Sequence, residues 1–256
     1  MKILAMDSSG LVASAAIVTE TSVLAEYTTN YKKTHSQTLL PMIQEIVEMT
    51  ETELSELSAI AVTAGPGSFT GLRIGSATAK GLGQALKLPL ISVPTTLALA
   101  WNFAGSDALI CPLMDARRAQ VYTGLYRWNK EKECMDSLTG QLAVSVEEII
   151  EKVNRYGQPV IYLGDGMDAY RTVLCDRTNV PYYLAPLHQS RQSAASVAAC
   201  ALSVVKKATD LSKLSETVPD SEVCVISAAA FAPVYLRKSQ AEREREEQEK
   251  CAAEAK

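Results

Sequence analysis

The chain has 256 residues, of which 47% are apolar and 21% are charged, and its formal net charge is −4. This length is enough for one large domain or two small ones, each with a core. A domain that held a nucleic acid alone would be expected to show a basic face, and a pI of about 5.4 argues against one. The longest apolar stretch, residues 194–205, is shorter than the roughly 20 residues of a membrane span. Because Asp7 interrupts the first apolar run, we also expect no signal peptide and a cytoplasmic protein.

The first hundred residues are predicted to alternate between strands and helices. Residues 2–6, 13–18 and 23–29 should form three consecutive short strands, since the first is continuously apolar and a Ser-Ser-Gly turn follows it. Three strands followed by alternating helices and strands is the order of a ribonuclease-H-like unit. The later elements are expected as a helix at 37–49, a strand at 57–62, a helix at 70–86, a strand at 90–93 and a helical stretch to 101.

The same order recurs in the second half of the chain. Asp7, after the first strand, matches Asp115 at an offset of 108, and the turn at Gly65 matches one at Gly164 at an offset of 99. We therefore predict an α/β fold with two tandem ribonuclease-H-like domains of the actin, Hsp70 and sugar-kinase type, with a cleft between them. The expected boundaries are 1–106 for the first domain, 107–238 for the second and 239–256 for a charged tail, either a solvated helix or disordered.

A glycine-rich string, AGPGSFTGLRIG, runs from Ala64 to Gly75 and joins a predicted strand to a predicted helix. The free N–H groups of a helix N-terminus suit an anion or the polar atoms of a partner. The string lacks the Gly-Lys-Ser/Thr of a Walker phosphate loop and the G-x-G-x-x-G spacing of a dinucleotide fingerprint. A plain tight connection therefore stays open as the alternative.

This string resembles the GPGSFTGLR-type signature of the bacterial TsaB family, formerly called YeaZ. The resemblance implies a subunit of the machinery that makes threonylcarbamoyladenosine in tRNA. It runs from residue 1 to about residue 237 and so covers nearly the whole chain. Four further segments resemble the family: the opening strand and Asp turn at 1–9, a helix start at 34–41, a D-A-R segment at 114–122 and a closing P-x-Y-L-R at 233–237.

The turn after the first strand is the candidate nucleotide contact. In this fold its acid and hydroxyls lie at the cleft, where a carboxylate suits Mg²⁺ and hydroxyl and N–H groups suit phosphate. If the chain holds a cofactor, we therefore expect ATP or ADP with Mg²⁺, at the cleft or at a subunit interface. The alternative is an ordinary turn whose short side chains cap their own backbone. The candidate residues are Asp7, Ser8, Ser9, Gly65 and Gly67.

Several features argue against catalysis by this chain. ATPases of this fold need a glycine-rich second phosphate loop after Asp115, where this chain has Ala-Arg-Arg. The sister transferase that the resemblance implies has a metal-binding H-x-x-x-H motif where this chain has Thr95 and Leu99, which cannot hold a metal. No G-x-S-x-G elbow or Ser/His/Asp grouping supports a protease. We predict a non-catalytic paralogue with no catalytic and no metal-binding residues.

Two helices are predicted to form a partner surface. The helix at 37–49 carries an apolar stripe, and the helix at 70–86 repeats small residues four apart. Each interior glycine costs about 1 kcal/mol relative to alanine, so something should pack closely against it. Packing on the chain's own sheet is the alternative. The predicted interface residues are Leu39, Met42, Ile43, Ile46, Gly71, Gly75, Ala79 and Gly83.

The leading hypothesis is a scaffolding subunit. By the resemblance, it would pair with a TsaD-type transferase, recruit a TsaE-type ATPase, reach tRNA only through the complex, and form a homodimer when alone. The runner-up is an active ATP-dependent small-molecule kinase of the same fold. Two short lysine pairs, at 32–33 and 206–207, are typical of solvated surface and give no nucleic-acid site.

Overall fold

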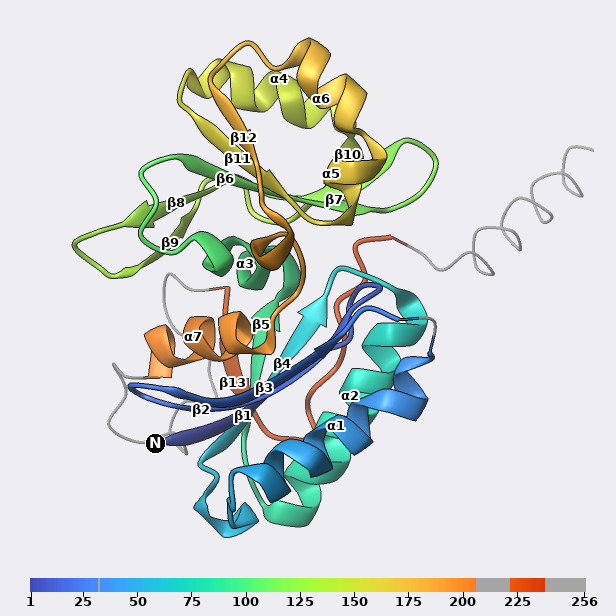
Figure 1. Cartoon of the computed structure of the whole chain (residues 1–256), viewed down its shortest axis with the longest axis vertical. Helices are drawn as coiled ribbons and strands as arrows, with labels where there is room; N and C mark the ends of the chain where they lie inside the picture. Colours follow the sequence, from blue (N-terminus) through green and yellow to red (C-terminus); the bar gives the residue numbers. More distant parts are fainter. Residues whose placement is uncertain (32, 206–221, 238–256) are drawn as a thin grey trace, which may run out of the picture.

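The computed structural model describes residues 1–31, 33–205 and 222–237, which form two α/β lobes, one above the other in Figure 1. The first lobe holds a six-stranded sheet in the order β13-β5-β4-β1-β2-β3. Strands β1 to β3 are antiparallel, whereas β4 and β5 run parallel to β1. The strands are β1 (Lys2–Asp7), β2 (Ala13–Thr19), β3 (Val23–Thr29), β4 (Ala59–Gly65), β5 (Leu90–Pro94) and β13 (Cys224–Ile226).

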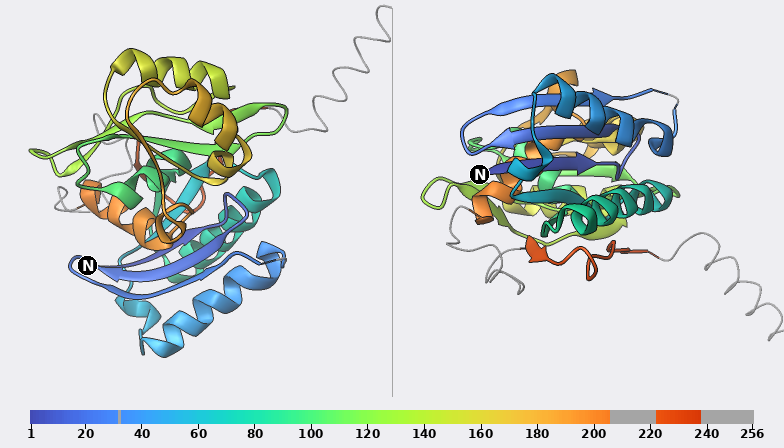
Figure 2. Two further views of the ribbon diagram at one scale, coloured as in Figure 1. Left: turned by 45° about the horizontal axis from the view of Figure 1, so that its top comes forward. Right: turned by 90° about the horizontal axis from the view of Figure 1, so that it is seen from below.

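Helices cover both faces of this sheet, which explains why residues 3–6 of β1 are all apolar. Ile3 packs in the core of one face and Leu4 in the core of the other, as the alternation of a strand requires. Helices α1 (His35–Met49) and α2 (Phe69–Leu86) lie side by side on the outer face (Figure 2). Helices α3 (Thr95–Ala100) and α7 (Ala194–Val205) lie on the face toward the second lobe (Figure 1).

The second lobe repeats the strand order of the first. Its sheet runs β10-β7-β6-β11-β12, which corresponds strand by strand to β3-β2-β1-β4-β5. This confirms two ribonuclease-H-like units. The elements are β6 (Leu109–Asp115), β7 (Gln120–Thr123), β8 (Tyr126–Asn129), β9 (Cys134–Ser137), β10 (Leu142–Ser145), α4 (Val146–Tyr156), β11 (Val160–Leu163), α5 (Asp165–Ala169), α6 (Arg171–Arg177) and β12 (Tyr182–Leu184), and short 3-10 turns lie at Leu54–Glu56, Trp101–Phe103 and Leu187–Gln189.

The domain division needs a correction, because the chain returns to the first lobe. Helix α7 packs on β1 and β2, and β13 pairs antiparallel with β5, although both lie within the range 107–238 predicted for the second domain. The predicted tail, 239–256, and the lysines at 32, 206 and 207 lie outside the described residues. Within the described ranges, no helix combines the length and the apolar character that crossing a bilayer requires.

Candidate functional site

The acid at the end of β1 is enclosed by its own turn. Asp7 is only 1% exposed, and its Oδ1 accepts hydrogen bonds from the backbone N–H (2.8 Å) and the hydroxyl (2.6 Å) of Ser9. Burial raises the pKa of the Asp7 carboxyl, and the bonds from Ser9 oppose that rise. The Ser8 hydroxyl donates to the carbonyl of Gly71 at 2.9 Å. These polar groups are thus satisfied within the chain, as in the turn alternative.

The glycine-rich turn is shaped by close packing on the turn after β1. A Cβ at Gly67, Gly71 or Gly75 would overlap an atom of the Ser8–Ser9 turn. The Ser68 N–H donates to the carbonyl of Ser9 at 2.7 Å, and the Ser68 hydroxyl caps α2 by accepting from the Gly71 N–H. These contacts explain three of the glycines by internal fit.

Gly65, at the end of β4, fits the segment that returns from the second lobe. Its φ is +119°, and a Cβ there would overlap the carbonyl oxygen of Val234. The Val234 N–H also donates to the carbonyl of Ala64 at 2.7 Å. Both observations place the backbone of Gly65 against protein rather than against the cleft.

The equivalent acid of the second lobe, Asp115, lies at the cleft. Its Oδ1 accepts from the Tyr170 hydroxyl (3.2 Å) and from the Arg117 N–H (2.9 Å), and its own N–H donates to Asp165 Oδ1 (3.1 Å). Burial raises the pKa of Asp165. The Arg117 guanidinium lies 3.4 Å from Asp115 Oδ2. This end of the cleft therefore carries two carboxylates and one cation.

The connection from β6 to β7 adopts a strained backbone. Arg117, Arg118 and Ala119 have φ values of +65°, +56° and +55°. A non-glycine residue in the left-handed region costs roughly 1–2 kcal/mol. The loop is closed by the Ala116 N–H, which donates to the Gln120 carbonyl at 2.9 Å. The segment that stands where ATPases of this fold need a second phosphate loop is therefore a tight turn that carries two exposed arginines.

A cavity of about 380 Å³ lies between the lobes at this point. Ser9 and Gly67 line it, whereas Asp7, Ser8 and Gly65 do not. The oxygens of Asp115 and Asp165 are ligands of the kind that Mg²⁺ takes. The first-lobe carboxylate that should face them, Asp7, accepts hydrogen bonds from Ser9 instead. The residues present therefore do not fit a nucleotide bound by both lobes. Nucleotide contact through the turn after β1 stays a prediction that this geometry does not support.

The position of the transferase metal motif is part of the core. Thr95 and Leu99, on α3, are 0% and 2% exposed. Of the two histidines, His35 has its Nε2 2.8 Å from the Gly10 carbonyl, and His188 lies on a 3-10 turn of the other lobe. Across residues 1–31, 33–205 and 222–237, acids, histidines and cysteines form no group of three or more with the arrangement of a metal site.

The residues predicted for the partner surface lie inside the first lobe. Leu39, on α1, is 1% exposed and packs on the sheet, and a Cβ at Gly83, on α2, would press against Leu90 and Ala228. In this conformation they offer no free surface to a partner, and own-sheet packing explains them. The same holds for the remaining predicted residues, which are buried as well: Met42, Ile43, Ile46, Gly71, Gly75 and Ala79.

The exposed faces of the same helices carry small and apolar residues that the predicted interface did not include. Gly81 lies inside α2, is exposed, and a Cβ added there would meet no atom within 4 Å. Ala77 and Ala85, four residues to either side, are exposed too. On α1, Leu40 is 55% and Met49 is 74% exposed. A helix-interior glycine outside the buried four-residue repeat was the available hint.

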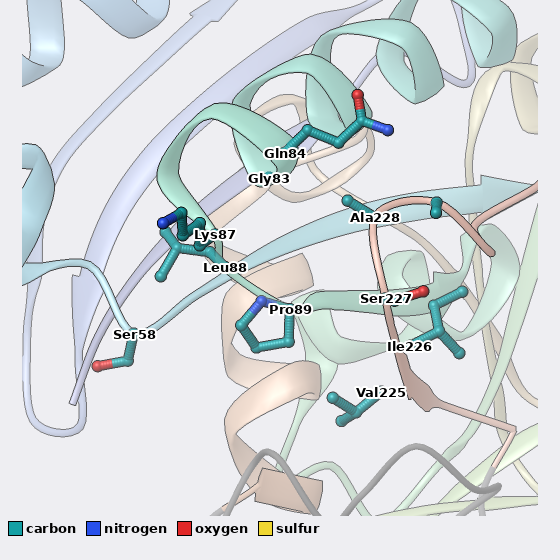
Figure 3. Close-up of a pocket in the computed structure, with 11 residues that line it drawn as sticks. Ser58, Gly83, Gln84, Lys87, Leu88, Pro89, Val225, Ile226, Ser227 and Ala228 are labelled. Atoms are coloured by element: carbon teal, nitrogen blue, oxygen red, sulfur yellow. The ribbon is translucent and has the colours of Figure 1, made fainter.

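A second hollow, of about 640 Å³, lies behind the first lobe, between the end of α2 and β13. Figure 3 shows Pro89 and Lys87 on one side and Ile226 and Ala228 on the other. Among its described lining residues, Lys87 is the one charged side chain, with no carboxylate, histidine or cysteine beside it. The lining therefore offers apolar contact but no catalytic group.

Comparison with known proteins agrees with this architecture. Residues 22–253 match the family model described as "TsaD: tRNA N6-adenosine threonylcarbamoyltransferase". The tRNA threonylcarbamoyladenosine biosynthesis protein TsaB of Bacillus subtilis is 35% identical over 176 residues, which are 69% of this chain and 76% of that protein. Its counterpart in Escherichia coli is 31% identical over 173 residues, 66% of this chain and 74% of that protein.

A solved structure shares the fold. YeaZ from Pseudomonas aeruginosa superposes with a TM-score of 0.72 at 24% identity, covering 92% of this chain and 99% of that one. The two-lobed architecture is thus found in a protein of similar length. The TsaD family model matches this chain as well. From the sequence matches, the chain belongs to the TsaB family of tRNA threonylcarbamoyladenosine biosynthesis proteins.

Proposed function

We propose that this chain is a non-catalytic cytoplasmic subunit that pairs with a TsaD-type transferase to form threonylcarbamoyladenosine in tRNA, next to the anticodon. The relatives' names supply the pathway. The proposal includes recruitment of a TsaE-type ATPase by the pair and a homodimer when the transferase is missing. The internal use of Asp7 supports a role other than catalysis, since its carboxylate accepts from Ser9 instead of facing the cavity.

The observation that best supports the pairing is an exposed glycine, Gly81, inside helix α2. The other glycines of α2 are explained by close packing inside the lobe, whereas no contact among the described residues requires a glycine at position 81. An interior glycine costs about 1 kcal/mol of helix stability relative to alanine. A partner helix that approaches α2 closely would offset that cost. On the neighbouring α1, Leu40 and Met49 are exposed as well and offer apolar area to a partner.

The kinase alternative is not favoured. A kinase of this fold needs a flexible glycine-rich loop against the phosphates, whereas here Arg117 and Arg118 stand in a closed, left-handed turn. The opposing acid, Asp7, is buried and hydrogen-bonded to its own turn.

The pairing is tested with Ala77→Arg and Gly81→Arg. Both positions are exposed, so we expect each variant to fold with a free energy of unfolding within about 1 kcal/mol of the wild type. A long cationic side chain at either position would hold the partner helix away. We therefore expect loss of co-elution with a TsaD-type subunit in size-exclusion chromatography.

Thr172→Arg, an equally exposed change on α6 of the second lobe, is the matched control and should pair normally. Normal pairing by folded Ala77→Arg and Gly81→Arg would show that this face of α2 is not the interface.

A further inference from the structure

An aromatic and cationic cluster joins the start of α2 to the returning C-terminal segment. The rings of Phe69 and Tyr235 lie 4.9 Å apart, and the Arg73 guanidinium carbon lies 3.9 Å from the centre of the Phe69 ring. Arg73 also donates from Nε to the Tyr235 hydroxyl at 3.3 Å. Tyr235 is 40% exposed and the Arg73 side chain is exposed. The cluster therefore presents a ring and a cation on one surface.

Arg237 extends this surface to the second lobe. Its Nη1 donates to the carbonyl of Ala116 at 2.7 Å, which ties the C-terminal segment to the strained β6–β7 turn. The next residues of that turn, Arg117 and Arg118, are exposed. Figure 1 shows the orange-red segment ending between the two lobes. The C-terminal segment thus links arginines from three distant parts of the sequence, and one of them, Arg117, lines the cavity between the lobes.

Within the described residues, most of this charge has no acidic partner. Arg73, Arg118 and Arg237 form no ion pair with any acid in the described part of the chain, and Arg117 has one contact, with Asp115 at 3.4 Å. Such a concentration stands out on a protein whose net charge is −4. The turn that displays Arg117 and Arg118 accepts three left-handed residues to do so, and strain of this kind clusters at functional sites.

We propose that this surface, defined by Arg73, Arg117, Arg118 and Tyr235, binds a structured RNA. A guanidinium fork matches phosphate geometry, and an exposed aromatic ring offers a stacking platform for an unpaired base. An acidic protein partner is the competing occupant, and the test below distinguishes it from RNA. The inference rests on the proposed function and deepens it, because it gives this subunit its own contact with the RNA. Because the net charge of the chain is −4, we expect the contact to be local and to depend on these residues. This inference replaces the expectation that the chain reaches tRNA only through the complex.

The test is titration of a fluorescein-labelled tRNA with the full chain at low salt, followed by fluorescence anisotropy. Arg73→Gln with Arg118→Gln removes two phosphate contacts, so we expect binding weaker on the order of tenfold and a salt slope smaller by about 1.5. Tyr235→Ala should weaken binding with the slope unchanged. Arg155→Gln with Arg177→Gln removes the same charge from α4 and α6, on the far side of the second lobe, and should bind as the wild type does.

Three results would overturn the inference: no measurable affinity of the wild type for RNA, equal loss in the two arginine pairs, or lost binding of a protein partner with RNA binding intact. Co-elution with the TsaD-type subunit is measured on the same variants. Failure of wild-type pairing would contradict the proposed function, whereas pairing without RNA affinity would contradict only this inference.

Discussion

The corresponding strand ends of the two lobes keep one feature and differ in another. The corresponding strands β4 and β11 each lead into a glycine with positive φ, Gly65 at +119° and Gly164 at +97°. The acid after the first strand has diverged, because Asp7 is sealed by its own turn whereas Asp115 lies at the cavity between the lobes. Backbone packing therefore requires the glycine in both lobes, whereas the acid has a structural role in the first lobe and lies at the cavity in the second.

The largest expected effect concerns the shared glycine. A Cβ at Gly65 would overlap the carbonyl oxygen of Val234, and one at Gly164 would overlap that of Leu113. We expect Gly65→Ala and Gly164→Ala each to lower the free energy of unfolding by roughly 3 kcal/mol or more, measured by urea denaturation.

Gly105→Ala is the matched control. Its φ is +89°, but no atom lies within 4 Å of a Cβ there, so we expect about 1 kcal/mol. If all three variants were equally stable, the common packing requirement of the two lobes would be refuted.

Substitution of the second glycine of each turn, Gly67 or Gly166, should affect the stability of the two lobes differently. A Cβ at Gly67 would overlap the Ser9 carbonyl oxygen, whereas one at Gly166 would lie 3.0 Å from that of Leu113. We expect Gly67→Ala to destabilise by about 2–3 kcal/mol and Gly166→Ala by about 1 kcal/mol or less. Thermal unfolding of both variants measures the difference, and the reverse order would contradict the closer packing assigned to the first lobe.

A smaller effect, which depends on pH, should distinguish the two acids. Because burial raises the pKa of Asp7 in the folded state, the native protein binds more protons than the unfolded chain above the ordinary value of 3.8. The contribution of Asp7 to the free energy of unfolding therefore falls as the pH rises above 3.8 and through the raised pKa of the folded state. Asn keeps the Oδ1 acceptor for Ser9 and does not ionise, so Asp7→Asn should be the more stable protein at pH 7.

Below about pH 3 the protonated acid of the wild type and the Asn of the variant are both neutral, and the stability difference should shrink. Denaturant unfolding across pH measures it, with Asp115→Asn as the comparison on the more exposed acid. A wild type that is more stable than Asp7→Asn at pH 7 would contradict the account, because it would mean that the hydrogen bonds from Ser9 and the charge interaction with His35 outweigh the cost of burying the carboxylate.

The elements and the duplication could be predicted because their signals are local. The apolar run of β1 and the recurrence of Asp7 at Asp115 depend only on nearby residues and on order along the chain. The return of α7 to the first sheet could not, since an apolar helix at 194–205 fits either sheet. The stripe around Leu39 likewise has the same spacing whether it faces its own sheet or a partner.

The candidate site was less predictable, because it depends on contacts between distant segments. An aspartate at position 7 could serve either as a metal ligand or as a residue that caps its own turn. The hydrogen bonds from Ser9 to Asp7 and from Ser8 to the Gly71 carbonyl favour the capped turn, and they depend on the folded structure. Arg73, Arg118 and Tyr235 each lie in a segment that resembles the family, but the sequence does not specify the path of the C-terminal segment that links these segments in space.

The central claim is that Asp7 is structural and that the chain acts through its surfaces. The most direct measurement is the rate of threonylcarbamoyl transfer to tRNA by a complex reconstituted with Asp7→Asn, with assembly checked by size-exclusion chromatography. We predict the wild-type rate in the fully assembled complex. A fall of about 10²-fold or more at unchanged assembly, as the loss of a catalytic acid or base typically produces, would contradict it.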